Sequence, residues 1–156
     1  MARYLVALGS SHKSGFQYIN NAIKQIATIN GITLISSSRI YKNCSLGTTY
    51  NSLFYNCVCA IFAHHNALVL YRELLVIENL LGRIRSYKFA RRTIDIDVLL
   101  SVDFSFKFGN FELPHREAFN RNFFVIPALE ALELTDWPVP IKLLRARNSG
   151  YLCPRE

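Results

Sequence analysis

Two aspartates spaced two residues apart, Asp95 and Asp97, are the side chains best placed to do chemistry. They lie in the apolar run 94–100, which is typical of a strand, and alternation along a strand sends both carboxylates to one face. At ~3.3 Å per residue their Cα atoms lie about 6.6 Å apart, and at an effective dielectric of ~20 the two charges repel by on the order of 2.5 kcal/mol. A cation between them is therefore expected.

A hard divalent cation fits this expectation. Mg²⁺ takes oxygen ligands and typically combines one or two carboxylates with the phosphates of a substrate. The spacing thus indicates a nucleotide-transfer site. The alternative is that both aspartates only pair with nearby arginines on a solvated face, because ion-pair networks resemble sites.

The segment directly before the aspartates, residues 82–93, is strongly basic. Its cations are Arg83, Arg85, Lys88, Arg91 and Arg92. A guanidinium presents a planar fork that matches phosphate oxygens, so a basic loop hinged at Gly82 could close over a triphosphate. A solvated charge run or an RNA-binding loop are the alternatives, although neither explains why the basic segment leads straight into Asp-Ile-Asp.

Residues that could grip a flat ring lie in and after a polar loop at residues 42–52. Leu46 offers an apolar wall, Asn56 offers both donors and acceptors, and Phe54 and Phe123 could stack on the two ring faces. The alternative is that both phenylalanines are ordinary core aromatics.

His115 and Arg121 add an imidazole and a guanidinium further along the chain. Alone they indicate little, because a lone histidine gains a functional meaning only in a suitable cleft.

Composition limits the class of protein. The 156 residues suit a single domain, 1–156, and 51% hydrophobic against 19% charged residues excludes a disordered chain. The apolar stretch 67–81 is interrupted by three charged residues, and the N-terminal apolar run is shorter than a secretory signal, so a soluble, cytoplasmic protein is expected. The net charge of +7 predicts a partner that bears phosphate, either nucleotide or nucleic acid.

The four cysteines, Cys44, Cys57, Cys59 and Cys153, have no zinc-type spacing. A domain of this size does not need disulfides, so we expect reduced thiols.

Periodicity predicts strands at residues 3–8, 33–41, 55–62 and 94–100, helices after Ser14, from Asn66 to Gly82 and at 122–132, and an edge hairpin at 104–113. Ser14 with Gln17 forms a capping box, and Asn66 is an N-cap candidate. The order strand, helix, strand, strand, helix, strand is typical of an α+β, ferredoxin-like split βαβ sandwich. We expect a mostly antiparallel sheet with helices packed on one face, which leaves the other face for a site.

Taken together, these features resemble the 6-hydroxymethyl-7,8-dihydropterin pyrophosphokinase family. The matching stretches, in family order, are Ala7-Leu8-Gly9-Ser10, Ser37-Ser38-Arg39-Ile40-Tyr41 with Leu46-Gly47, Phe54-Tyr55-Asn56, Ile77-Glu78 with Gly82-Arg83-Ile84-Arg85, Arg92-Thr93-Ile94-Asp95-Ile96-Asp97, and Pro114-His115 with Arg121 and Phe123. They cover roughly residues 4–131. The R-T-I-D-I-D run that follows G-R-I-R is the most specific part.

The resemblance implies a reaction in folate biosynthesis. Pyrophosphate passes from ATP to 6-hydroxymethyl-7,8-dihydropterin and gives AMP and the pterin diphosphate. The implied partners are these two substrates, with neither nucleic acid nor membrane, and a monomer is expected.

The resemblance also implies roles for single residues. Asp95 and Asp97 would bind two Mg²⁺ ions that bridge ATP, and Arg83 and Arg92 would hold the phosphates during transfer. The implied ATP-binding residues further include Glu78, Arg85, Val98, His115 and Arg121. The implied pterin-binding residues are Asn56, with Leu46 and the backbone near Asn43, at the ring edge and Phe54 and Phe123 on the ring faces.

Some positions depart from the family pattern. Ser11 stands where the first strand motif commonly continues with Asn, and Phe89-Ala90-Arg91 stands where Trp-Gly-Pro usually precedes the loop arginine. Ser86, Asn110 and Leu75 also replace residues found in some relatives. The tail 134–156 matches poorly, and no role is inferred for it.

Two rival functions stay open. An RNA-binding module of the same topology would expose aromatics on its central strands, whereas the strand here presents two aspartates that would repel phosphates. A metal-dependent nuclease would cleave nucleic acid without needing a pterin.

Overall fold

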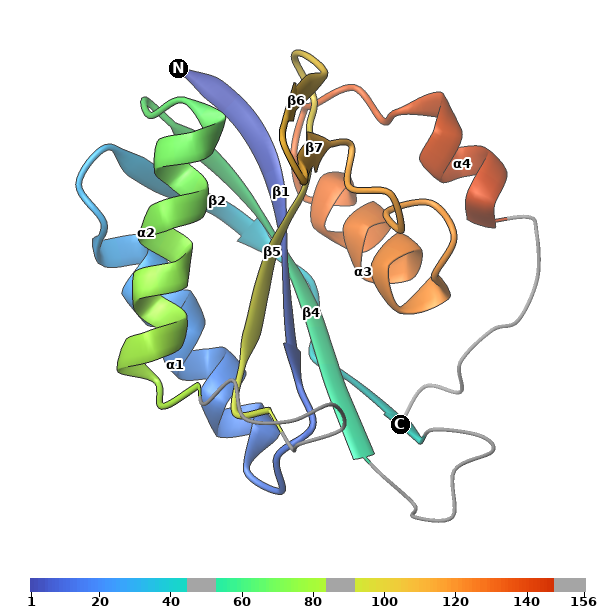
Figure 1. The fold of residues 1–156 in the computed structure, drawn as a ribbon. Coiled ribbons are helices and arrows are strands. Elements are labelled where there is room, and N and C mark those ends of the chain that lie inside the picture. The colour runs from blue at the N-terminus through green and yellow to red at the C-terminus, as the bar shows by residue number, and fades with distance from the viewer. Residues whose placement is uncertain (45–52, 84–91, 148–156) are drawn as a thin grey trace.

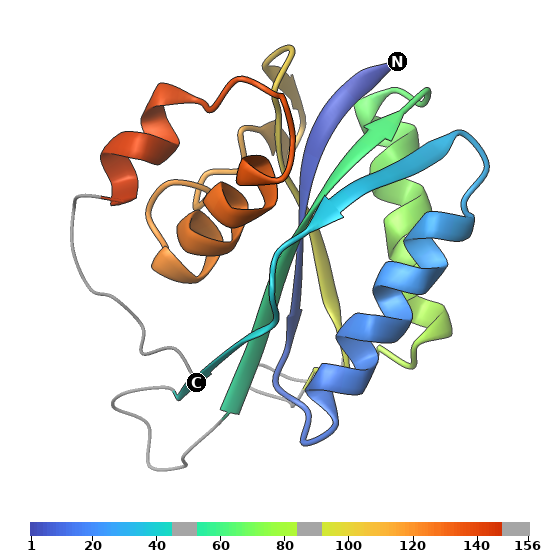
Figure 2. The ribbon, with the colours of Figure 1, turned by 180° about the vertical axis from the view of Figure 1, so that it is seen from behind.

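The computed structural model describes residues 1–44, 53–83 and 92–147. An antiparallel sheet lies at its centre (Figure 1). The strands β1 (Ala2–Ser10) and β4 (Leu53–Ala63) form the middle, and β5 (Asp95–Ser101) lies beside β1 at one edge. At the other side of β4, β2 (Ile32–Ser37) and β3 (Tyr41–Cys44) pair with it in succession, as Figure 2 shows from behind.

The sequence predicts one strand at residues 33–41, whereas the structure has two, with a break between them at residues 38–40. Ser38 is the reason. Its backbone N–H donates to the carbonyl of Val58 at 2.9 Å, while its hydroxyl oxygen accepts from the Val58 N–H at 3.0 Å and donates to the Arg39 carbonyl at 2.8 Å. A side chain thus takes over bonds that the backbone ladder would otherwise make.

The helices α1 (Gly15–Thr28) and α2 (Ala67–Leu80) cover one face of the sheet. Their buried residues, including Ile19, Ile26 and Leu74, share a core with strand residues such as Leu8 and Ile96. Alternation along each strand places one set of apolar residues on this face, so the amphipathic helices bury their apolar stripes here.

The two predicted caps have different outcomes. Asn66 is confirmed, because its side chain accepts from the backbone N–H groups of Leu68 and Val69 at 3.1 and 3.0 Å. The capping box at Ser14 is wrong, because its side chain makes no cap hydrogen bond. Its N–H instead donates to Nδ1 of His12 at 3.1 Å in the turn that precedes α1.

The opposite face also carries helices. α3 (Asn122–Glu133) lies over the middle of the sheet and α4 (Ile141–Arg147) packs beside α3 (Figure 1), and the buried strand residues there include Leu5, Ala7, Val58 and Ala60. The predicted α+β, ferredoxin-like class is confirmed, but the expectation that helices pack on one face only is wrong. The physical reason is that β1 and β4 are apolar on both faces along this part of their length. The helix α4 lies in the tail to which the sequence assigned no role.

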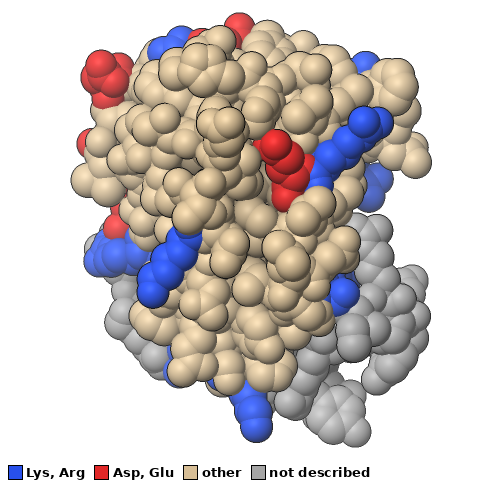
Figure 3. Space-filling view, turned by 90° about the vertical axis from the view of Figure 1, so that its left-hand side faces the viewer, with Lys and Arg blue, Asp and Glu red and all other residues tan. Residues whose placement is uncertain are grey.

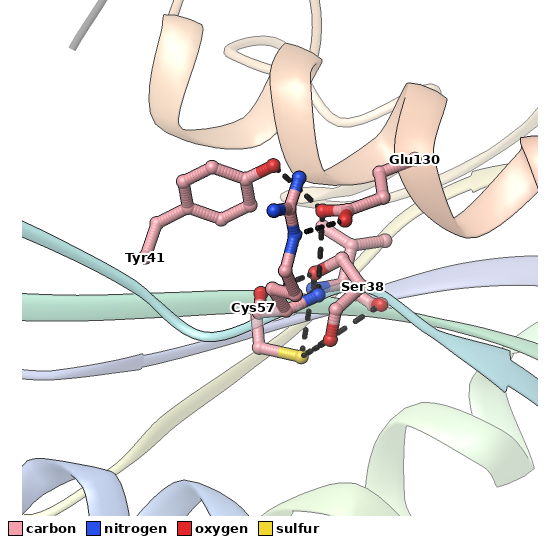
Figure 4. A network of polar contacts seen from close by, with 6 residues as sticks. Ser38, Tyr41, Cys57 and Glu130 are labelled. Carbon is pink, nitrogen blue, oxygen red and sulfur yellow. Dashed lines mark hydrogen bonds and ion pairs between the residues drawn. The ribbon is translucent and has the colours of Figure 1, made fainter. Parts of the chain in front are cut away.

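A polar network holds α3 against the strands (Figure 4). The Glu130 carboxylate accepts from the Tyr41 hydroxyl at 2.6 Å and from Nε of Arg39 at 2.5 Å, and the buried Ser36 hydroxyl donates to the Ala131 carbonyl at 2.7 Å. Burial opposes the ionisation of Glu130, but the hydrogen bonds from Tyr41 and Arg39 lower its pKa. These bonds therefore hold α3 in one position against this face of the sheet.

The remaining described elements add little to the site. The hairpin of β6 (Phe106–Phe108) and β7 (Phe111–Leu113) confirms the predicted edge hairpin. None of the helices in the described ranges has the length and apolarity needed to cross a membrane.

A matched pair of leucines tests the helix on the second face. Leu132 is 1% exposed, whereas Leu134, at the end of the same helix, is 65% exposed. Leu132→Ala should lower the free energy of unfolding by about 2–5 kcal/mol, because it leaves a cavity under α3. Leu134→Ala should change it by less than about 0.5 kcal/mol. Urea unfolding measures both, and equal effects would contradict the packing of α3 on the sheet.

Candidate active site

Antiparallel pairing aligns the predicted site residues in a row across the sheet. Gly9 of β1 pairs with Asn56 of β4 on one side and with Asp95 of β5 on the other, and Asn56 also pairs with Tyr41 of β3. Residues directly opposite each other in antiparallel strands point to the same face. The row therefore lies on the face that carries α3, next to the row Val58, Ala7 and Asp97.

Asp95 lies between two guanidinium groups. Its Oδ1 is 2.5 Å from Nη2 of Arg83, and its Oδ2 is 2.6 Å from Nη1 of Arg92. The two arginines differ in exposure, with 18% of the Arg83 side chain and 57% of the Arg92 side chain accessible. Arg83 is thus a fixed partner of Asp95, while Arg92 reaches it from solvent.

Asp97 differs from Asp95, because it has no ion pair within the ranges that the structure describes. Burial raises the pKa of Asp97, and the nearby charge of Asp95 adds to this, while His115 and the two arginines oppose it. The alternative that both aspartates merely pair with arginines therefore fits Asp95 only. Asp97 is a partly buried carboxylate whose charge the described residues leave without a direct counterion.

Glu78 connects the end of α2 to this strand. It is 1% exposed, its Oε1 accepts from the N–H of Ile96 at 2.6 Å, and it forms an ion pair with Nη1 of Arg83. Burial raises the pKa of Glu78, against the opposing effects of these two donors. Since β5 is an edge strand of the described sheet, the N–H of Ile96 needs such an acceptor. One carboxylate thus fixes both Arg83 and the residue between the two aspartates.

The turn after β1 fixes the backbone of Arg92. The N–H of Arg92 donates to the Ser11 hydroxyl at 2.9 Å, and its carbonyl accepts from the Ser11 N–H at 3.1 Å and from the Ser10 hydroxyl at 3.3 Å. From the sequence, Ser11 was noted only as a departure from the family pattern. Nothing in the sequence could have revealed this role, because the partners are about eighty residues apart.

His115 lies close enough to Asp97 that a protonated imidazole would favour the ionised carboxylate. Its N–H donates to the Leu99 carbonyl at 2.6 Å, and its Nδ1 accepts from the N–H of Glu117 at 3.2 Å. With Nδ1 as an acceptor, Nε2 carries the proton of the neutral ring and can donate to an anionic ligand.

Arg121 lies just before α3. Its Nε is 3.1 Å from a carboxylate oxygen of Glu117, and its guanidinium carbon is 5.5 Å from the ring centroid of Phe123. Phe123 packs edge to face on Phe124 at 4.6 Å. The start of α3 thus carries a cation and an aromatic ring side by side.

Three of the residues predicted to bind a ring share one face of the sheet. Asn43 pairs with Phe54, and Phe54 and Asn56 lie two apart on β4, so all three point to the same face. Phe54 is 39% exposed, which is unusual for a core aromatic. The side-chain oxygen of Asn43 is buried without a hydrogen-bond partner among the described residues, so it can accept from a ligand.

One predicted site residue does not join the others. The Val98 side chain is 2% exposed and belongs to the core under α1 and α2, on the face opposite Asp97. Any contact of Val98 with a nucleotide would have to come from its backbone. Leu46 and Arg85, together with Phe89-Ala90-Arg91, lie outside the described residues.

The donor set suits a hard cation. Asp95 and Asp97 project from one face, and His115 and two arginines lie around them. Within residues 1–44, 53–83 and 92–147, no group of three or more His, Cys, Asp or Glu is gathered as a metal site. Two carboxylates with vacant positions for phosphate oxygens and water are the set that Mg²⁺ takes at nucleotide sites.

Comparison with known proteins agrees with this geometry. The family described as 7,8-dihydro-6-hydroxymethylpterin-pyrophosphokinase (HPPK) matches residues 5–133. The chain belongs to the HPPK family. The predicted enzyme class, an ATP- and Mg-dependent pyrophosphokinase of folate biosynthesis, is therefore confirmed.

Similar HPPK proteins come from diverse organisms. The 2-amino-4-hydroxy-6-hydroxymethyldihydropteridine pyrophosphokinase of Haemophilus influenzae is 31% identical over 80% of this chain and 78% of its own length. The protein of the same name from Methylorubrum extorquens is 31% identical over 83% of this chain and 82% of its own length. The bifunctional protein FolKE of Lactococcus lactis is 27% identical, and the match spans only 37% of its length.

Among solved structures, a crystal structure of HPPK-DHPS in complex with substrates superimposes with a TM-score of 0.67. The match covers 95% of this chain and 43% of that one at 10% identity. At this identity the likeness concerns the HPPK fold alone.

Removal of one charge tests the electrostatics of the site. Because burial raises the pKa of Asp97, ionisation costs more in the folded chain than in the unfolded chain. Stability is therefore lost as the pH rises through the raised pKa. Without magnesium, Asp97→Asn should have a higher free energy of unfolding than wild type at pH 7. The difference should vanish below the ordinary carboxyl pKa of about 3.9.

Urea unfolding at several pH values measures this difference, with the exposed Asp136→Asn as the matched control. Magnesium with a non-hydrolysable ATP analogue should stabilise wild type but not Asp97→Asn, because only the wild type retains the ligand. A less stable Asp97→Asn variant at pH 7 would contradict the assigned environment.

The buried Glu78 gives a second test. Glu78→Gln keeps an acceptor for the N–H of Ile96 but no longer neutralises Arg83. If Glu78 acts by positioning, kcat should fall roughly 10–100-fold while KM for ATP changes little. The control is Glu73→Gln on the same helix, whose carboxylate pairs with His65 instead. A rise in KM for ATP at constant kcat would assign Glu78 to nucleotide contact.

Proposed function

We propose that this chain transfers the pyrophosphoryl group of ATP to 6-hydroxymethyl-7,8-dihydropterin, with Asp95 and Asp97 as ligands of two Mg²⁺ ions. The observation that supports this most strongly is the row across the sheet, with Asn56 at one end and Asp95 at the other. A ring-reading amide and a cation-binding carboxylate thus face the same side, two strands apart.

Mg²⁺ at the two aspartates would neutralise the phosphates and stabilise the attacking and leaving oxygens of an in-line displacement. The hydroxymethyl oxygen of the pterin forms a bond with the β-phosphorus of ATP and gives up its proton to water. The bond from that phosphorus to the oxygen that bridges it to the α-phosphorus breaks, and AMP leaves with that oxygen. The residues of the chain serve to hold the two substrates in line and to balance charge.

The arginines exchange partners in this proposal. Asp95 binds both Arg83 and Arg92 in the structure, whereas a metal-bound Asp95 no longer needs both cations. Arg92 is the more exposed of the two, so it is free to turn from Asp95 to a phosphate oxygen. Arg83 stays close to β5, because Glu78 holds its other Nη atom. His115, through Nε2, and Arg121 supply further donors to the nucleotide.

The pterin binds at the Asn56 end of the row, away from Asp95. Asn56 and Asn43 offer amide groups for the ring edge, and Phe54 and Phe123 offer ring faces. Asn56 is 8% exposed, so its amide is held in place and partly shielded from water. A heterocycle that replaces that water gains directional hydrogen bonds in a shielded site.

We also propose that the chain works as a cytoplasmic monomer without nucleic acid. On the α1 and α2 side, the basic side chains of the described residues are few and separated in view (Figure 3), so the described part of this side shows no continuous basic surface of the kind that binds RNA. On the other side, Asp95 and Asp97 would repel a nucleic acid backbone.

The decisive assay mixes purified protein with ATP, Mg²⁺ and the reduced hydroxymethylpterin. AMP and the pterin diphosphate should form only when all components are present. ATP hydrolysis that ignores the pterin, or cleavage of nucleic acid, would favour a different enzyme.

Two substitutions test the assigned roles. Asp97→Asn and Arg92→Ala should each lower kcat by about 10³-fold or more, since the first removes a ligand of Mg²⁺ and the second removes a positive charge that balances the transferred phosphates. Controls are Asp136→Asn and Arg72→Ala, which change exposed residues remote from the row. AMP formation is measured by chromatography, and circular dichroism confirms the fold. Near-normal turnover by Asp97→Asn or Arg92→Ala would refute the assignment.

A further inference from the structure

Gly9 occupies the centre of the row between Asn56 and Asp95. Its neighbours along β1, Leu8 and Ser10, are both buried, whereas Gly9 itself is partly exposed. The residue two positions earlier on the same face, Ala7, is 3% exposed and lies under the α3 core. The covered part of this face therefore ends at Ala7, and the accessible part begins at Gly9.

The fold gives no reason for a glycine at this position. The φ angle of Gly9 is outside the left-handed region, and among the described residues an added Cβ would meet only Oδ1 of Asn56 at 3.4 Å and the Tyr55 carbonyl at 4.0 Å, which are ordinary contacts. Glycine inside a strand costs roughly 0.5–1 kcal/mol relative to alanine. It often marks a place where a ligand approaches the backbone closely.

The other described glycines are explained by the fold. Gly31, Gly82 and Gly109 have positive φ angles, which side chains rarely adopt. A Cβ at Gly15 would lie 2.4 Å from a ring carbon of Tyr55. Among the described residues, Gly9 is thus the glycine whose missing side chain serves neither backbone conformation nor packing.

We infer that Gly9 is a positioning and specificity residue. Because it has no side chain, the pterin can lie against its backbone, with the ring edge at Asn56 and the hydroxymethyl group toward the metal-binding Asp95. Strands lie about 4.8 Å apart, so Asn56 and Asp95 are roughly 9.6 Å apart at their Cα atoms, with Gly9 midway. A flat ring held at Asn56 that presents its hydroxymethyl group to phosphates at Asp95 must cross Gly9. Any side chain there would lift the ring or displace the hydroxymethyl oxygen. This inference rests on the proposed function.

The graded series Gly9→Ala and Gly9→Val tests it. The thermal midpoint of Gly9→Ala should equal or exceed that of wild type, because the added methyl makes only ordinary contacts and suits a strand. Its kcat/KM for the pterin should fall at least tenfold, and that of Gly9→Val should fall further. Affinity for a magnesium complex of a non-hydrolysable ATP analogue should stay within twofold for Gly9→Ala, since the phosphates are held around Asp95.

Each alternative outcome is informative. Wild-type protein that forms no AMP would overturn the proposed function, and this inference with it. If wild type is active, a stable Gly9→Ala variant with kcat/KM for the pterin within twofold of wild type would overturn this inference alone. A strongly lowered thermal midpoint of Gly9→Ala would also overturn it, since the glycine would then serve the fold. Gly15→Ala, which should lose stability through its clash with Tyr55, shows how such a structural defect looks.

Discussion

The site depends on one constraint, the repulsion among a carboxylate near the end of α2 and two carboxylates at the start of β5. Glu78, Asp95 and Asp97 come close together, and two of them are buried enough for the pKa to be raised. Negative charges in such surroundings are stable only with cations or hydrogen-bond donors beside them. The donors come from three separate parts of the chain, namely Arg83 shortly after α2, Arg92 shortly before β5, and the backbone of β5 itself.

This arrangement divides the three carboxylates by role. Glu78 is used within the protein, since it binds a backbone N–H and a guanidinium and is almost without solvent contact. Asp95 is held by Arg83, which Glu78 keeps in place, and by the more exposed Arg92, which can leave it when another cation binds. Asp97 keeps a charge that the described residues do not balance, which is a cost to the free protein and a means of binding a metal. Residues at binding sites commonly lower the stability of the free protein while they serve its function.

The central strand connects this charge to the rest of the molecule. Along one half, β1 is apolar on both faces and lies between the α1–α2 layer and the α3–α4 layer. At its end the second face changes to Gly9, and the following Ser10 and Ser11 bind the backbone of Arg92. Within ten residues, β1 and the turn after it thus contribute to the core, place Gly9 between Asn56 and Asp95, and bind the backbone of Arg92. Packing of the helices fixes the strand, and the strand in turn fixes the site.

The sequence by itself determined what depends on short-range periodicity. The alternation at residues 94–100 predicted that Asp95 and Asp97 share a face, the 3–4 spacing predicted α1 and α2, Asn66 predicted a cap, and the ordered motifs predicted the HPPK family. These features follow from the geometry of a single strand or helix, so residues a few positions apart suffice to reveal them.

The tertiary structure alone decided the distinction between Asp95 and Asp97, the internal role of Glu78, the contact of Ser11 with Arg92, and the helices on the second face. Each of these depends on strand register or on helix packing between residues tens of positions apart. A shift of one residue in the pairing of β1 would move Gly9 out of line with Asn56 and Asp95 and undo the row. Burial and packing of the whole core set that register, and no local pattern in the chain records it.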